Sequence, residues 1–330
     1  MSTNIQGLVD RTYREYLEPM DDLQPYTLLT SSLTDSATTV SFNGDLLTQE
    51  EEDIMEAGSI IEIGQELMLC KTLSTTLDTV DVVRGVRWTT ASAHSSGATI
   101  KIAPPFPRKN VFDAVCDQIK NLYPTLFAVE TKSVSAKVGY IPLSGTSDNY
   151  LVAPISAISQ MTDFSAGSDE TGIIYQGVAV ELVDLPNPFT YTDADGNSQT
   201  ITYTNNGPNK VNALQVYGVS SGHTVFVTFK KKFIEPTAED NTLAEIGLEN
   251  EYEPIIMAGV AAQIIAGRDI PTATADYITD QLSTSTFPVN SAANIRTSLL
   301  RYQNDLIEQA RKDLRARYPE PVALNKITYA

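Results

Sequence analysis

The chain has 330 residues, 42% of them apolar, and is long enough for two or three domains with buried cores. Its 41 acidic residues outnumber the 23 basic ones and give a net charge of −18 at pH 7, which argues against specific nucleic-acid binding. Cys70 and Cys116 are the only cysteines, too few for a disulfide framework or a metal cluster. No stretch has the pattern of a signal peptide or a membrane span, so we expect a soluble protein made without a secretion signal.

The first predicted element is an amphipathic helix over residues 4–17. Its apolar side chains recur at the spacing of one helical face, and they are Ile5, Leu8, Val9, Tyr13, Tyr16 and Leu17. A second amphipathic helix is predicted over residues 111–122. Pro107 lies just ahead of it, where helix starts tolerate proline, and Pro124 ends it.

Residues 26–103, between these helices, have the pattern of a small β-module. Short β-prone runs occur at residues 38–42, 59–64, 66–70 and 79–83. Between them lies an acidic block without lysine or arginine, made of Asp45, Glu50, Glu51, Glu52, Asp53 and Glu56. Such runs are usually solvated loops or turns, and the alternative is a surface that repels DNA or a neighbouring chain.

Residues 126–240 form a second β-rich region. Residues 189–203 have the pattern of a hairpin, and residues 211–219 and 223–230 suggest another pair around a turn at 220–222. In the last of these strands Val225, Val227 and Phe229 alternate onto one side. We expect a second β-sandwich or barrel.

The helical period returns after residue 241. Residues 252–266 are almost wholly apolar and predict a buried helix, and residues 274–282 predict a shorter one. The longest helix, residues 290–317, has an apolar face made of Ile295, Leu299, Tyr302, Leu306, Ala310 and Leu314, widened by Leu300 and Ile307. Pro319 and Pro321 follow it and stop it.

These elements predict an α+β fold. A helical bundle body would be formed by residues 1–25, 104–125 and 241–318, with two β-rich modules (sandwich or barrel) inserted at residues 26–103 and 126–240. Residues 319–330 would then be an extended C-terminal arm.

The sequence contains no convincing catalytic or metal site. His94 and His223 are the only histidines, and neither has a metal-ligand spacing to a cysteine. The common phosphate-binding, nucleophile-elbow and zinc motifs do not occur. Asp193 and Asp195 resemble the start of a calcium loop, but a hairpin turn explains them equally well. We therefore predict no enzymatic activity, no metal and no cofactor.

One motif is more informative, the pattern R-G-x-x-x-T-T-A-x-A-H-x-x-G. Its main residues are Arg84, Gly85, Thr89, Ala91, His94 and Gly97. Gly85 permits a tight turn after a strand and Gly97 a return turn, and His94 is expected to bond to the backbone within the loop. The motif thus predicts a β-module and no reaction.

This motif resembles a module common in virion proteins of tailed bacteriophages, where it follows a strand similar to residues 63–70. The order of the other parts, over most of the chain, looks like the head-to-tail connector (adaptor-like neck) proteins of siphophages. Trp88 stands where this family is expected to have a small residue, often glycine, so the local turn should differ.

The resemblance implies a structural protein of the virion neck, made in the host cytoplasm. It would form a homo-oligomeric ring, usually twelvefold in adaptors, between the portal protein and the downstream neck or tail proteins, with no membrane partner. DNA would pass through the ring without sequence-specific binding, since a negative channel lining keeps it from adhering.

Two alternatives belong to other classes. The same module also occurs in tail proteins, so the chain could be a distal tail or baseplate protein with glycan-binding β-modules. Aromatic platforms for sugars would then come from Trp88, Tyr140, Tyr150 and Tyr175, although core or interface positions explain these residues too. A cell-wall hydrolase would need a carboxylate pair such as Asp21 and Asp22, whose separation the sequence does not set.

The C-terminal arm suggests a partner contact. Leu324, Ile327 and Tyr329 could fill pockets of the portal protein while the backbone adds a strand to one of its sheets. A frayed terminus is the alternative.

Overall fold

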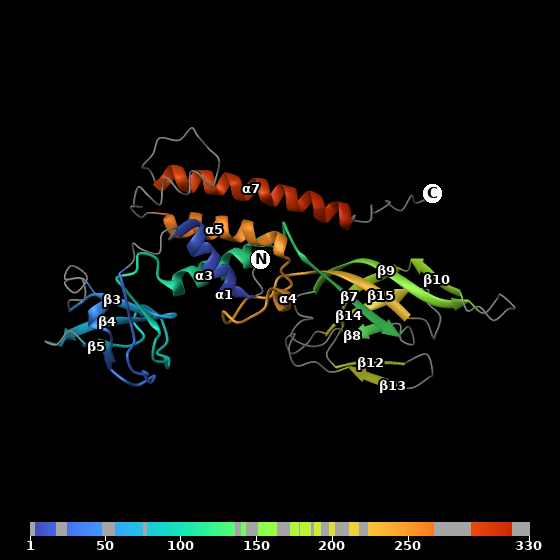
Figure 1. Cartoon of the computed structure of the whole chain (residues 1–330). Coiled ribbons are helices and arrows are strands. Elements are labelled where there is room, and N and C mark those ends of the chain that lie inside the picture. The colour runs from blue at the N-terminus through green and yellow to red at the C-terminus, as the bar shows by residue number, and fades with distance from the viewer. Residues whose placement is uncertain are drawn as a thin grey trace. The chain divides into compact units, whose positions relative to one another are not determined.

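The computed structural model confirms a mixed α+β fold (Figure 1). It describes residues 4–17, 25–47, 57–74, 78–135, 140–142, 151–163, 172–177, 179–185, 188–192, 198–201, 211–217, 224–266 and 292–318. The chain forms two compact units: residues 1–118, 237–240 and 253–306 make the first, and residues 119–236, 241–252 and 307–330 the second. The expected β-module of residues 26–103 lies wholly in the first unit. The finer division into one helical body and two inserted modules stays a prediction.

The first unit contains a six-stranded antiparallel sheet with the order β1-β6-β3-β4-β5-β2. Its strands are β1 (Tyr26–Leu28), β2 (Thr39–Ser41), β3 (Ile60–Ile63), β4 (Glu66–Leu73), β5 (Thr79–Val83) and β6 (Thr99–Ile102). Four of them match the β-prone runs expected in this module. Leu29 bridges Phe42, and the backbone N–H of Thr30 donates to the carbonyl of Ser41 at 3.0 Å, so the ends of the two edge strands meet. The sheet therefore curls into a half-barrel.

The core of this sheet follows the two-residue period of its strands. Alternate side chains point to the same face of a strand, and one face here is apolar. Val40, Ile61, Val80 and Ile100 are each fully buried, and they belong to one cluster with Met68. Burial on this face fixes the register, because a slip of one residue would expose every one of these side chains.

The helices of the first unit confirm two of the predicted amphipathic segments. Asn4 accepts from the N–H of Gly7 at 3.0 Å and caps α1 (Ile5–Thr12), after which a π-helical turn continues to Leu17. Helix α3 (Arg108–Leu122) begins directly after Pro107. Helix α5 (Glu253–Ile265) is apolar all round and nearly all buried, as its composition predicted, and α1 packs against it (Figure 1).

Helix α7 (Ala292–Arg317) confirms the longest predicted helix but corrects its buried face. Ile295, Leu299, Ala310 and Leu314 are buried as expected. Tyr302 and Leu300, assigned to the apolar face, are each 36% exposed, and the buried residue at this level is Gln303. The spacing of the apolar residues did not indicate that Gln303 is buried, because a polar residue beside the apolar face of a helix is normally exposed to solvent.

The position of Gln303 is explained by a polar contact inside the first unit. Its side-chain nitrogen donates to Oε1 of Gln118 at 2.9 Å and to the carbonyl of Ile255 at 3.2 Å. Gly259 makes room for this pair, because a Cβ there would lie 2.2 Å from an amide atom of each glutamine. Buried amides satisfied in this way cost little to bury.

The second unit contains all the other strands of the described residues. A four-stranded sheet has the order β10-β9-β15-β7, a three-stranded sheet the order β11-β14-β8, and β12 pairs with β13. The strands are β7 (Ala128–Ser135), β8 (Tyr140–Pro142), β9 (Leu151–Asp163), β10 (Gly172–Gly177), β11 (Ala179–Leu185), β12 (Phe189–Thr192), β13 (Ser198–Ile201), β14 (Val211–Tyr217) and β15 (Thr224–Lys231).

The pairing of these strands confirms one expected hairpin and overturns the other. Strands β12 and β13 pair antiparallel as residues 189–203 predicted. Strands β14 and β15, expected to pair with each other, lie in different sheets: β14 pairs with β11 and β8, and β15 with β9 and β7. The buried face of β15 is confirmed, since Val225, Val227 and Phe229 are at most 1% exposed.

Within the described residues, no helix is both long enough and apolar enough to cross a membrane. The predicted helix of residues 274–282 lies outside the described part of the chain.

Candidate functional site

The motif loop begins with a turn that only glycine allows easily. Strand β5 ends at Val83, and Gly85 has a φ of +63°. A Cβ on Gly85 would lie 3.0 Å from the carbonyl oxygen of Thr89 and 3.3 Å from the N–H nitrogen of Ala91. The loop therefore folds back on itself at this residue, and a side chain would push its two limbs apart.

The motif residues converge on a side chain that the motif does not contain, the carboxylate of Glu66. This residue begins β4, and its side chain is completely buried. The carboxylate accepts from Nε and Nη2 of Arg84 at 2.6 Å each, and from the N–H groups of Gly85 and Ser92 at 3.1 Å each. Nε2 of His94 lies 3.0 Å away on the same carboxylate. A buried charge is tolerated only with partners of this kind.

Arg84 uses its whole guanidinium group within the module. Besides its two bonds to Glu66, Nη1 donates to the carbonyls of Thr34 and Ala37 at 2.7 and 2.9 Å, and Nη2 donates to the carbonyl of Ser92 at 2.6 Å. These five bonds match the five N–H donors of an arginine. The side chain therefore joins β4, the loop before β2 and the motif loop, and lysine could not replace it.

Thr89 fastens the motif loop to the sheet from its other side. Its hydroxyl oxygen accepts from the N–H of Leu67 at 3.1 Å and donates to the carbonyl of Val86 at 2.8 Å. Leu67 lies next to Glu66 on β4, so both attachments of the loop meet the same end of one strand.

His94 differs from expectation. Its backbone exchanges two hydrogen bonds of 2.8 Å with Leu33, but its ring bonds to the Glu66 carboxylate and not to the backbone. The ring also lies 3.3 Å from the hydroxyl of Ser92. Since an ionised carboxylate only accepts, Nε2 carries the hydrogen in the bond to Glu66. Beyond His94, Gly97 has a φ of +84° at the return turn into β6.

The pKa of Glu66 reports the balance of these contacts. Burial raises it, but the hydrogen bonds from Arg84, His94 and the backbone of Ser92, together with the charge of Arg84, outweigh burial and hold the pKa below its ordinary value. Glu66 is therefore ionised at neutral pH. A carboxylate with this many donors is a structural acceptor and a poor base.

Trp88 lies at the tip of the same loop and is 97% exposed. Its φ is +68°, and that of the preceding Arg87 is +52°, a conformation that large side chains rarely adopt. The sequence predicted a different turn here because Trp88 replaces a small residue. Thr89 is bonded to the backbone of β4, and Gly85 to the carboxylate of Glu66. These bonds hold the loop that carries the exposed indole in place.

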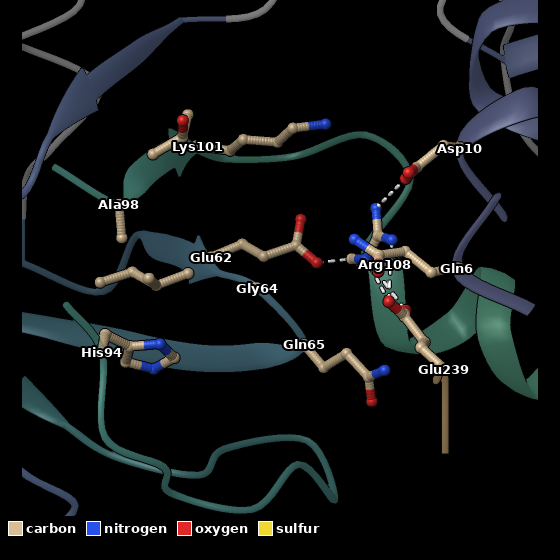
Figure 2. Close-up of a pocket in the computed structure, with 12 residues that line it drawn as sticks. Gln6, Asp10, Glu62, Gly64, Gln65, His94, Ala98, Lys101, Arg108 and Glu239 are labelled. Atoms are coloured by element: carbon tan, nitrogen blue, oxygen red, sulfur yellow. Dashed lines mark hydrogen bonds and ion pairs between the residues drawn. The ribbon is translucent and has the colours of Figure 1, made fainter. Parts of the chain in front are cut away.

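A second cluster surrounds a cavity of about 420 Å³ in the first unit (Figure 2). Arg108, at the start of α3, is bonded to Asp10 of α1 at 2.7 Å and to Glu239 at 2.8 Å, and its N–H donates to Glu62 of β3. Burial alone lowers the pKa of Arg108, but bonds to Glu239 and Asp10 outweigh it and raise that pKa. The cluster joins the N-terminal helix, the sheet and residues 237–240.

In both clusters, carboxylates are paired with an arginine. The carboxylates of Asp10 and Glu239 bond to Arg108, and that of Glu66 bonds to Arg84. Among the residues that the structure describes, no group of three His, Cys, Asp or Glu side chains could hold a metal ion. Sequence reasoning missed Glu66 and Arg108. The signal for Glu66 was an acidic residue at the start of an apolar strand.

Several predicted site residues lie outside the described part of the chain. They are His223, Asp193, Asp195, the acidic residues Glu50, Glu51, Glu52, Asp53 and Glu56, and the arm residues Leu324, Ile327 and Tyr329.

No protein-family model matches the chain, and no curated protein matches its sequence.

Proposed function

We propose that the protein is a non-enzymatic structural subunit of a tailed-phage virion, forming a ring between the portal and the tail through which DNA passes. The observation that supports this best is the structural role of the motif residues. Arg84, Gly85 and His94 all bond to one buried carboxylate, an arrangement that rigidifies a loop.

The rigid loop gives the proposed subunit a contact point. An almost fully exposed tryptophan loses a large apolar area from water when a partner covers it, and tryptophan is enriched at the energetic centres of protein interfaces. The unusual backbone at Arg87 and Trp88 has a cost of order 1–3 kcal/mol per residue, and strain of this kind is typical of binding loops. Trp88 is therefore the proposed contact between ring neighbours.

The proposed architecture follows the sequence. Helices α1, α3, α5 and α7 would make one helical body, with the two β-rich regions as inserted modules that reach neighbouring rings. The charge of −18 suits a channel that DNA traverses, because it opposes adhesion of phosphates. Residues 319–330, with Leu324, Ile327 and Tyr329, would order on the portal by strand addition.

The ring contact can be tested with Trp88→Gly. Glycine relieves the positive φ and removes the indole, so the subunit should fold at least as stably but assemble more weakly. Tyr26→Ser, which removes a half-exposed aromatic of the same sheet, is the matched control. Sedimentation velocity should show wild-type and Tyr26→Ser oligomers and a shift of Trp88→Gly toward monomer. Unchanged assembly of Trp88→Gly would refute the proposed contact.

A second candidate function is favoured by the same side chain. An exposed indole is also a platform on which sugar rings pack, as in a distal tail or baseplate protein. Host cell walls would then retain the wild-type protein and release Trp88→Gly, while assembly would be unaffected. Retention without ring formation would select this candidate over the neck subunit.

A further inference from the structure

The second unit contains a small basic cavity in a strongly acidic protein. The cavity measures about 300 Å³ and is lined by Pro124, Thr125, Phe127, Lys230, Arg311, Leu314, Arg315 and Tyr318. Three of these side chains are basic, and none of the lining residues is acidic. The net charge of the chain is −18, so three basic side chains around one cavity make a locally positive region in an acidic protein.

The cations are placed by regular structure. Arg311 and Arg315 are one turn apart on α7, on either side of the buried Leu314, and therefore share a face. Lys230 extends from β15, with its Nζ 4.9 Å from the centre of the Phe127 ring. Helix α7 and strand β15 thus place two guanidinium groups, an ammonium group and aromatic side chains around the same cavity.

The charge of the two arginines is only weakly compensated. Arg311 reaches Glu308 at 3.4 Å, an exposed pair of a kind that contributes little. Within the described part of the chain Arg315 forms no ion pair. Arg317, two residues beyond Arg315, differs because it bonds to Glu249 at 3.1 Å and to Glu251 at 2.7 Å. The two cavity arginines can therefore bind an anion, whereas Arg317 is already paired with carboxylates of its own chain.

We infer that this cavity binds carboxylate side chains from a second copy of the chain, supplied by the acidic run Glu50, Glu51, Glu52 and Asp53. The inference rests on the proposed ring, because it names a contact between its subunits. Arginine forks match carboxylates in geometry, and identical acidic subunits need such an opposite-charge contact to approach one another. The run is the densest acidic stretch of the sequence. Because the run and the cavity belong to different parts of the chain, the contact is head-to-tail, the type that closes into rings.

DNA is the less suitable anion. Its phosphates lie on the outside of a stiff duplex and do not enter a hollow of this size, whereas single side chains do. A duplex that approached would also meet the repulsion of the whole acidic subunit. Inorganic phosphate could enter, and it serves below as a competitor.

A charge exchange within the full-length chain tests the assignment. Arg311→Glu/Arg315→Glu makes the cavity side chains net negative, and Glu50→Arg/Glu51→Arg/Glu52→Arg/Asp53→Arg makes the run positive. Each set of substitutions should shift the oligomer toward monomer in sedimentation velocity, by at least about tenfold in the association constant. The chain with both sets of substitutions should recover assembly, since the cavity and the run again carry opposite charges. Lys312→Glu, on the same helix but outside the cavity lining, should assemble like wild type.

Unfolding curves of every variant provide the folding control. Wild-type assembly of Arg311→Glu/Arg315→Glu, or no recovery in the variant that combines both sets of substitutions, would overturn the inference. Those results would leave the ring itself intact if wild-type protein still forms it.

If the wild-type chain is a monomer, the ring proposal fails and the cavity is tested separately. A labelled peptide of residues 47–57 should bind the intact monomer, more weakly at high salt, in competition with inorganic phosphate and not with a DNA duplex. Binding should be lost with Arg311→Glu/Arg315→Glu and with a peptide whose four run carboxylates are amides. No binding, or a duplex that binds the cavity better than the peptide, would overturn the inference.

Discussion

Arg84 and Glu66 form a buried bidentate ion pair in which both N–H···O distances are 2.6 Å, and their side chains are 6% and 0% exposed. The pair joins the start of β4 to the motif loop. Removing one partner should destabilise the fold more than breaking a surface salt bridge would, because the buried charge left behind has no water as an alternative partner.

Removing the arginine should therefore be costly. Arg84→Met leaves a buried carboxylate without its main partner and should lower the free energy of unfolding by about 3–5 kcal/mol. Arg84→Lys restores the charge but not the five donors, and should still cost at least about 1 kcal/mol. Urea unfolding at pH 7 measures both. The exposed neighbour provides the control, since Arg87→Met should change stability by less than about 0.5 kcal/mol. Equal effects of the two methionine variants would show that the buried pair has no special role.

The same carboxylate should make the fold sensitive to acid. The pKa of Glu66 in the folded protein lies below its ordinary value of 4.5, so the unfolded chain binds the proton more tightly. Its contribution to stability is complete above pH 4.5 and is lost as the pH falls through the folded pKa. Glu66→Gln removes this term. The difference in unfolding free energy between wild type and Glu66→Gln should therefore be constant near neutral pH and shrink below pH 4.5. A difference that grows on acidification would mean that the pKa is raised.

A comparison of Gly85 with Gly97 separates two costs of adding a side chain to the motif. One is the cost of a positive φ, and the other is the steric contact of the new Cβ with the loop. Both have positive φ, but a Cβ at Gly97 meets open space, while one at Gly85 contacts the backbone of Thr89 at 3.0 Å. Gly97→Ala should cost only the left-handed conformation, about 1–2 kcal/mol. Gly85→Ala should cost more, because the loop must also open. Thermal unfolding of the two variants makes the comparison, and a larger effect at Gly97 would contradict the packing described for the loop.

Gly259 should be intolerant of even one methyl group. The alanine Cβ would lie 2.2 Å from amide atoms of Gln118 and Gln303, so their hydrogen bond must break or the helices must separate. We expect Gly259→Ala to destabilise by about 1–3 kcal/mol. The companion experiment introduces Gly259→Ala into a Gln118→Ala/Gln303→Ala background, where the space is free and the cost should nearly vanish. An undiminished cost there would place the strain elsewhere.

The contrast between Val80 and Gln303 shows what the sequence could and could not predict. Strands such as β5 and helices such as α1 were predicted because their burial follows a local period of two or 3.6 residues. Gln303 is buried because of Gln118, which lies 185 residues away, and no local pattern carries that information. The same limit explains β14 and β15. Each strand was expected from its own residues, but the choice of partner is non-local, and adjacent strands here joined different sheets.

The site was predictable to a similar degree. Arg84, Gly85 and His94 were singled out as a motif, and the positive φ of Gly85 and Gly97 follows from glycine chemistry. The common acceptor, Glu66, was not identified, because 18 residues separate it from Arg84 and its burial depends on how the sheet curls. The basic cavity required the structure as well, since Lys230 and Arg315 meet only after folding.

The proposed place of the protein in the neck of a tailed-phage virion is the central claim, and immunogold labelling tests it most directly. Gold labels on an epitope fused to the chain, imaged by electron microscopy on particles of the proposed source phage, show in one measurement whether the chain is there and where. A structural neck subunit predicts labels clustered at the junction between the head and the tail, on every particle that has a tail. Labels at the far tip of the tail, or particles without any label, would contradict the account.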